Sequence, residues 1–239
     1  MSVAPKRDLI GPVKVAISGM VYTFRTQRHM RFHLYVVLAV TLMGLLFNLS
    51  LREMLVLLFV ISLVLVAEMF NSAIEATVDL VQPNYHPMAK FAKDIPAGAV
   101  LITTIVALVV GTLMLLGPQR WETIKINLTA DSPSIPFVPR LITGGFLVLI
   151  IVIIGKGLGK RGQVLKGGLV SGHAAFGFFL ATGIMFLTDQ LVVAGLGLVL
   201  AAIIAQSRWE AKIHSIFELS LGAAVGVMMG LLLFGLMPK

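Results

Sequence analysis

Four polar side chains recur at the end of a long apolar stretch in the N-terminal half of the chain. Glu68, Asn71, Glu75 and Asp79 are separated by three, four and four residues, so a helix would carry them on one face. A carboxylate within a membrane span is costly and marks a functional site. Carboxylates with an amide between them could hold Mg²⁺ and activate a hydroxyl group. From these residues alone, polar glue between helices and an ion or proton pathway remain open.

A second polar group occurs near the C-terminus. His214 and Glu218 are four residues apart, so on a helix Glu218 could fix one imidazole nitrogen and leave the other as a nucleophile. Nearby cations would bind a phosphate, although a single histidine is more often a packing residue. The other members of the group lie at ends of apolar stretches: Lys156, Lys160, Arg161, Ser171, Gly172, His173, Ser207 and Arg208.

The composition is typical of a protein with several membrane spans. Of the 239 residues, 58% are hydrophobic and 13% are charged, and the mean hydropathy is +0.97. An average soluble domain has about 25% charged residues, so the composition excludes an ordinary soluble enzyme and a disordered chain. The chain has no cysteine, which excludes disulfides, thiolate metal sites and cysteine nucleophiles.

Seven apolar stretches predict an all-α, polytopic helical membrane protein with about seven transmembrane helices. They cover residues 34–50, 54–80, 96–117, 141–155, 168–187, 190–206 and 216–236. Because a span takes about 20 residues, the fourth and sixth stretches must extend into their flanks or be re-entrant. Asp94, two residues before Pro96, is suited to cap the third span. Gly222, Gly226 and Gly230 predict a close helix-packing face in the last span.

The N-terminal segment predicts a surface helix. Leu9, Val13, Ile17, Met20 and Phe24 recur at helical spacing among basic residues, which is typical of an amphipathic helix in the membrane interface.

One long polar segment divides the chain into modules of three and four spans. Residues 118–140 contain four prolines and Trp121, which suits a segment in the headgroup region. We therefore expect an N-terminal domain over 1–117, a linker over 118–140 and a C-terminal domain over 141–239.

The distribution of positive charge predicts the orientation. With the N-terminus in the cytoplasm, 14 of the 19 Lys and Arg residues lie on the cytoplasmic side and five outside, in line with the positive-inside rule. The net charge of +8 therefore indicates topology and attraction to anionic lipid, and no nucleic-acid partner is expected.

The string from Glu68 to Asp79, with Tyr85-His86 and Ala92-Lys93-Asp94, resembles the signature of the small prokaryotic diacylglycerol kinases. That family includes the undecaprenol kinases of Gram-positive bacteria, and the similarity covers about residues 10–117. It implies a homotrimeric kinase in the bacterial cell membrane that phosphorylates a lipid alcohol with Mg²⁺ and ATP at the cytoplasmic face. By position, Glu68 would be the general base and Glu75 a metal ligand. The nucleotide and the reacting phosphoryl group would be held by Asn71, Lys93 and Asp94.

One position departs from this pattern. The family usually has a metal-binding glutamate where this chain has Gln27. An amide oxygen can still contact Mg²⁺, but the site loses one negative charge, so metal affinity should fall.

The C-terminal group resembles the three motifs of the type 2 phosphatidic acid phosphatase (PAP2) superfamily, over about residues 141–236. By position, His214 would form a phosphohistidine, His173 would protonate the leaving oxygen and Glu218 would orient His214. The phosphate would be held by Lys156, Arg161, Ser171, Gly172 and Arg208. The first motif is compressed and lacks its proline, Val170 replaces the proline of the second motif, and Glu218 replaces an aspartate. No cofactor is expected for this half.

Together the two resemblances predict a bifunctional lipid enzyme. The kinase would phosphorylate undecaprenol or diacylglycerol, and the phosphatase would act on a lipid phosphate or diphosphate. Two alternatives remain open at this point: one half is a degenerate scaffold or lipid-binding module, or the chain is an ion- or proton-coupled transporter.

Overall fold

The structure is a computed structural model that describes residues 11–47, 49–117, 136–159 and 168–235. These residues form helices and no β-strand. The elements are α1 (Gly11–Thr26), α2 (Arg28–Leu46), α3 (Leu51–Val81), α4 (Pro87–Leu116), α6 (Phe137–Leu158), α7 (Gly172–Leu187), α8 (Leu191–Glu210), α9 (Ile216–Gly230) and the π-helical turn η1 (Leu231–Gly235). In this part of the chain, six helices are long and apolar enough to cross a membrane, and α7 is a shorter apolar helix. The predicted all-α polytopic architecture is confirmed.

Serine caps define the start of several helices. Ser50 and Glu53 form a reciprocal capping box at α3, and Ser215 and Glu218 form another at α9. The Ser171 hydroxyl accepts a hydrogen bond from the N–H of Ala174 at α7. These side chains satisfy backbone N–H groups that have no partner within their helix.

The prediction that Asp94 caps the third span was wrong. α4 begins at Pro87, and the ring nitrogen of His86 accepts the hydrogen bond from the N–H of Met88. Proline at the first helical position needs no N–H partner, so the helix begins before its apolar part. Asp94 therefore lies two turns inside α4, and Pro96 is inside the helix.

Other predicted boundaries shift by a few residues. α6 extends the fourth apolar stretch at both ends, as expected, and residues 137–140 of the expected linker are helical. α7 begins later than its apolar stretch. Leu9, Trp121, Lys160 and Arg161 lie outside the described residues.

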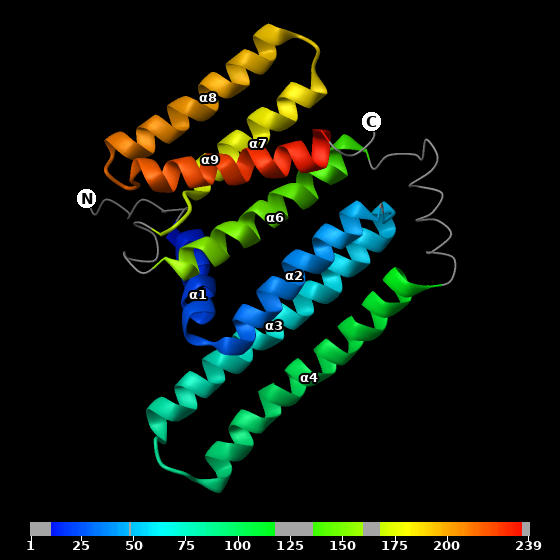
Figure 1. Cartoon of the computed structure of the whole chain (residues 1–239). Coiled ribbons are helices and arrows are strands. Elements are labelled where there is room, and N and C mark those ends of the chain that lie inside the picture. Colours follow the sequence, from blue (N-terminus) through cyan, green and yellow to red (C-terminus); the bar gives the residue numbers. More distant parts are fainter. Residues whose placement is uncertain (1–10, 48, 118–135, 160–167, 236–239) are drawn as a thin grey trace, which may run out of the picture.

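Helices α2, α3 and α4 lie beside one another, and α6 to α9 form a second group, with α1 next to the end of α6 (Figure 1). α2 contacts both α3 and α6, so it joins the two groups. The shared core includes Phe24 of α1, Leu34 of α2 and Leu147 of α6. The buried face of α1, with Val21 and Phe24, thus packs against the rest of the protein.

The predicted glycine face in the last span is confirmed by its packing against α7. A Cβ atom built on Gly222 would lie 2.5 Å from the carbonyl oxygen of Ser171, and one on Gly226 would lie 2.2 Å from that of Ala175. Only glycine allows the two backbones to approach this closely. The contact also brings the first turns of α7 and α9 together, and the Ser171 N–H donates to the Glu218 carbonyl oxygen at 3.1 Å.

We expect Gly226→Ala to destabilise the protein, because α7 and α9 must separate to admit the methyl group. Overpacking of this kind costs about 1–3 kcal/mol. Thermal unfolding in detergent should show a transition lowered by several degrees. Gly195→Ala in α8 is the matched control, since a Cβ there meets nothing within 4 Å. Equal transitions for the two variants would contradict the packing argument.

Candidate functional site

The buried end of the polar stripe on α3 forms the first candidate site, which we call the carboxylate site (Glu68, Asn71 and Glu75). The exposed fractions of Glu68 and Asn71 are 2% and 7%. The Asn71 side-chain amide donates to Glu75 Oε1 at 3.2 Å, and the charge of Glu75 acts on Glu68. The three side chains thus act as one group, as their spacing predicts.

His29 is a neighbour of the carboxylate site that the sequence analysis missed. It lies in the first turn of α2, within electrostatic reach of Glu68. Gln27, two residues earlier, is the N-cap of α2, and its half-buried side chain makes no capping hydrogen bond. Sequence spacing gives no indication that the segment with Gln27 and His29 belongs near the carboxylate site. This segment meets α3 only through the packing of α2 against α3.

A cavity of about 300 Å³ lies at the turn between α3 and α4. Two ion pairs on its wall join Lys93 to Asp79 at 2.7 Å and Lys90 to Asp94 at 2.6 Å. Both pairs are largely exposed, and exposed ion pairs contribute little to stability. Lys93 and Asp94 are therefore available to an incoming ligand next to the polar stripe.

The donor set of the carboxylate site fits a magnesium ion that is shared with a nucleotide. No group of three or more His, Asp or Glu side chains among the described residues forms a complete metal site. Mg²⁺ is usually held by one or two carboxylates together with substrate phosphates. Glu75 supplies a carboxylate, and the side-chain oxygen of Asn71 is buried without a hydrogen-bond partner.

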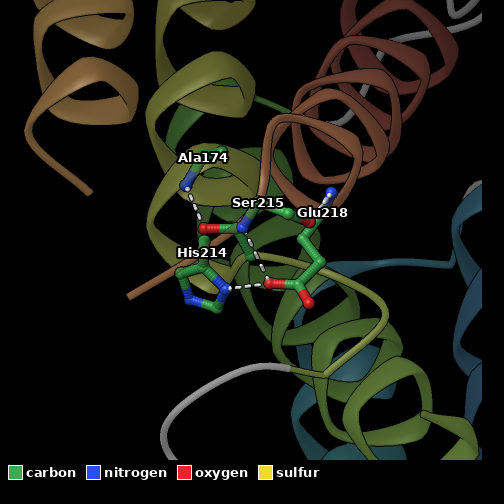
Figure 2. A network of polar contacts seen from close by, with 5 residues as sticks. Ala174, His214, Ser215 and Glu218 are labelled. Atoms are coloured by element: carbon green, nitrogen blue, oxygen red, sulfur yellow. Dashed lines mark hydrogen bonds and ion pairs between the residues drawn. The ribbon is translucent and has the colours of Figure 1, made fainter. Parts of the chain in front are cut away.

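The second candidate site lies where α6 and α8 end and where α7 and α9 begin. We call it the histidine site (Lys156, His173, Arg208, His214 and Glu218). Its centre is a hydrogen bond of 2.8 Å between His214 Nδ1 and Glu218 Oε2. Figure 2 shows the same carboxylate between His214 and the N–H of Ser215. The capping box of α9 therefore holds Glu218 in place to orient the imidazole.

The turn after α8 brings Arg208 next to His214. The N–H groups of Ile213 and His214 donate to the carbonyl oxygen of Arg208 at 3.2 and 3.4 Å. Lys212, with φ of 53°, allows the chain to reverse. The exposed fraction of His214 is 6%, so its ring is largely shielded from water.

His173 and Lys156 complete the described part of the histidine site. His173 is exposed at the start of α7, and its ring is within electrostatic reach of Arg208 and Lys156. The charge of Glu218 acts on Lys156. Ser171 is fully buried and Gly172 begins α7. Arg161 lies outside the described residues.

The two candidate sites lie at the same end of the helices. Arg25, two residues before Gln27, donates hydrogen bonds to the carbonyl oxygens of Lys156 and Gly159 at the end of α6. The end of α1 that precedes Gln27 is therefore in direct contact with the end of α6 that carries Lys156. From the sequence, Arg25 is only one of the basic residues of the expected surface helix, and its spacing gives no indication of this contact.

Comparison with known proteins identifies relatives of the N-terminal half. The chain is 41% identical over 117 residues to a diacylglycerol kinase of Synechocystis, which covers 48% of this chain and 66% of that protein. It is 39% identical over 98 residues to the undecaprenol kinase of Bacillus subtilis, covering 41% of this chain and 80% of the relative. The diacylglycerol kinase of Escherichia coli K12 is 44% identical over 55 residues, which are 23% of this chain and 45% of that protein.

Two family profiles match the chain. The profile of prokaryotic diacylglycerol kinase matches residues 14–115, and that of the PAP2 superfamily matches residues 97–239, more than half of the chain. The chain belongs to both families. The diacylglycerol kinase match contains the carboxylate site, and the PAP2 match contains the histidine site. No solved structure matches the chain.

Membership of these families, with the membrane helices, identifies a membrane protein with lipid kinase-type and phosphatase-type domains. A kinase family implies ATP and usually a divalent metal. The two profile matches overlap at residues 97–115, within α4.

Proposed function

We propose that the carboxylate site transfers the γ-phosphoryl group of ATP to a lipid alcohol. Glu68 accepts the proton of the lipid hydroxyl, whose oxygen attacks the γ-phosphorus, and ADP leaves. Lys93 and Asp94, beside the cavity at the α3–α4 turn, contact the nucleotide. The observation that carries the proposal is the buried Glu68 next to the Asn71–Glu75 pair.

Glu75, Asn71 and Gln27 are the side chains we assign to Mg²⁺. The ion neutralises phosphate charge when it is bound with ATP. The chain's contribution is to hold one carboxylate and two amide oxygens at one end of α2 and α3. Since amides carry no charge, this set binds Mg²⁺ less tightly than a set with a second carboxylate.

We expect Gln27→Glu to raise kinase activity when Mg²⁺ is limiting. The added negative charge increases metal affinity, so the Mg²⁺ concentration for half-maximal activity should fall about fivefold to tenfold, with little change at saturating Mg²⁺. Initial rates across a Mg²⁺ titration measure this. Gln206→Glu at the end of α8 is a matched control away from α2 and α3. An unchanged Mg²⁺ dependence would contradict the assignment of Gln27.

We propose that the histidine site removes a phosphate group from a lipid phosphate or diphosphate. Nε2 of His214 attacks the terminal phosphorus, and His173 gives a proton to the leaving oxygen. Water, deprotonated by His173, then releases inorganic phosphate from His214. Lys156, Arg161, Arg208, Ser171 and Gly172 hold the phosphate. The observation that carries this proposal is the short hydrogen bond from His214 to Glu218, which leaves Nε2 for attack.

A kinase and a phosphatase acting on one lipid would only hydrolyse ATP, so we propose that their substrates differ. The kinase converts undecaprenol to its monophosphate, and the phosphatase converts undecaprenyl diphosphate to the same product. Both halves then supply one carrier pool. Because both sites lie at one end of the helices, both lipids are taken from the same, cytoplasmic leaflet.

Substrate panels test this scheme. Labelled ATP is offered with undecaprenol or diacylglycerol, and phosphate release is measured from undecaprenyl diphosphate, phosphatidate and phosphatidylglycerol phosphate. The scheme predicts the highest kcat/KM for undecaprenol and undecaprenyl diphosphate. Transfer to diacylglycerol alone, or release from phosphatidate alone, would contradict a shared undecaprenyl pool.

We propose a homotrimer in the bacterial cell membrane with a cytoplasmic N-terminus. The most apolar window of α4 has no residue buried within the chain, so α4 can pack against a second copy through its apolar face. The linker over 118–140 then joins a kinase domain (1–117) to a phosphatase domain (141–239). The positive-inside distribution supports the orientation.

A further inference from the structure

The surface helix α1 packs onto the end of α6, although the two helices belong to different halves of the chain. Arg25 Nη2 donates to the carbonyl oxygen of Lys156 at 2.7 Å and to that of Gly159 at 3.0 Å. Next to this contact, Phe24 has an exposed fraction of 1%. A Cβ atom on Gly157 would lie 2.0 Å from the Phe24 ring, so α1 sits directly on the α6 backbone.

The contact acts on the end of a helix, where carbonyl groups have no partner within the helix. A guanidinium group satisfies such carbonyls and interacts favourably with the negative end of the helix dipole. Its planar, fixed donors can bind two oxygens at once. Arg25 therefore fixes the last turn of α6 and, with it, the backbone of Lys156.

Lys156 also lies against the segment before α7. Gly168 has φ of 113°, and a Cβ there would lie 3.1 Å from Lys156 Cγ, so this position requires glycine. Gly155 also has a close neighbour in this segment, because a Cβ atom built on it would lie 2.6 Å from the Val170 side chain. Lys156 has an exposed fraction of 8%, and it is in contact with Arg25 through its carbonyl oxygen and lies next to Gly168 through its side chain.

We propose that Arg25 is a positioning residue for the histidine site: it holds Lys156 where the ammonium group can bind the phosphate of the substrate. The surface helix of the kinase half is then also part of the phosphatase half. The inference rests on the phosphatase function proposed above.

The test compares Arg25→Ala, Arg25→Lys, Lys156→Ala and the double variant Arg25→Ala/Lys156→Ala, all in the full chain. Arg52→Ala is the matched control, since Arg52 is exposed at the start of α3, and this end of α3 lies away from the last turn of α6 in Figure 1. Two quantities are measured for each protein. One is kcat and KM for undecaprenyl diphosphate, and the other is the rise in melting temperature produced by orthovanadate, a phosphate analogue that needs no turnover.

We expect Arg25→Ala to raise KM about fivefold to tenfold and to leave kcat within about twofold of the native value. This is the pattern for losing an interaction that binds substrate and transition state equally. The rise in melting temperature produced by vanadate should become smaller. Arg25→Lys should recover part of the loss. The double variant should be no worse than Lys156→Ala, because Arg25 acts through Lys156. Additive losses, or an Arg25→Ala protein that matches Arg52→Ala, would overturn the inference.

The same measurements separate this inference from the phosphatase proposal. If the native protein hydrolyses no lipid diphosphate but is stabilised by vanadate in the expected variant order, the phosphatase proposal fails and the role of Arg25 stands. If hydrolysis is normal but Arg25→Ala changes neither quantity, the role of Arg25 fails alone. A native protein with neither hydrolysis nor vanadate stabilisation would overturn both.

Discussion

Glu68→Gln is expected to lower phosphoryl transfer from ATP to undecaprenol by at least about a hundredfold in kcat, the usual effect of removing a general base. Glutamine has nearly the same shape but cannot accept the hydroxyl proton. The Asn71–Glu75 pair is one turn away and stays intact, so nucleotide affinity should change little. Transfer of labelled phosphate to lipid, together with nucleotide binding by calorimetry, measures both quantities.

Two controls accompany this variant. Glu210→Gln makes the same chemical change at the exposed end of α8, where the carboxylate accepts a hydrogen bond from Gln206, and it should keep full kinase activity. Phosphate release from undecaprenyl diphosphate by Glu68→Gln should equal that of the native protein. Native-like kinase turnover in Glu68→Gln would remove Glu68 from the chemistry and favour a structural role for the polar stripe.

His214→Gln is expected to abolish phosphatase activity, with a loss on the order of a thousandfold or more, because among the described residues no other side chain is oriented as a nucleophile in its place. The amide retains some hydrogen-bonding capacity toward Glu218, so the fold around the α9 capping box should persist. The kinase activity of the same preparation is the internal control and should be unchanged.

Chemical trapping distinguishes a nucleophile from a binding residue. After brief incubation with terminally labelled undecaprenyl diphosphate, the native protein should carry an acid-labile phosphoryl group, and His214→Gln should carry none. His173→Ala should retain label longer, since the group that activates water is gone. Label on His214→Gln, or substantial hydrolysis by it, would contradict the phosphohistidine mechanism.

The sequence predicted the local features well, because they depend on periodicity. The three-and-four spacing from Glu68 to Glu75 defines a helix face directly, and Asn71 and Glu75 form a hydrogen bond on it. His214 lies two residues before α9, so the expected hydrogen bond to Glu218 forms at the start of that helix and not along a helix face. The glycine face of the last span is likewise a periodic pattern, and its close contact with α7 follows from the absence of side chains.

Contacts between distant segments were not predictable in this way. Arg25 looked like one of several interfacial cations, and nothing in its spacing indicates two carbonyl groups 131 and 134 residues later. His29 is likewise next to Glu68 only through tertiary packing. The wrong prediction of a helix cap at Asp94 has a local cause. The apolar pattern shows where the membrane span begins, but the helix itself starts two turns earlier, at His86 and Pro87.

The transporter alternative finds little support in this arrangement. A transporter site of the usual kind lies at the middle of the membrane between broken helices. Here the histidine site lies where α6 and α8 end and α7 and α9 begin, and the carboxylate site lies in the second half of the unbroken helix α3. The alternative that one half is inactive is tested by the Glu68→Gln and His214→Gln experiments. Each experiment measures the activity of one half and uses the activity of the other half as its control.

The most direct test of the central claim is product analysis on one purified preparation of the native chain. One portion receives undecaprenol and ATP labelled in the γ-phosphate, and another receives undecaprenyl diphosphate labelled in the lipid. We predict labelled undecaprenyl monophosphate in both, with loss of the first product in Glu68→Gln and of the second in His214→Gln. Monophosphate from only one portion, or from neither, would contradict a bifunctional enzyme that supplies one lipid carrier pool.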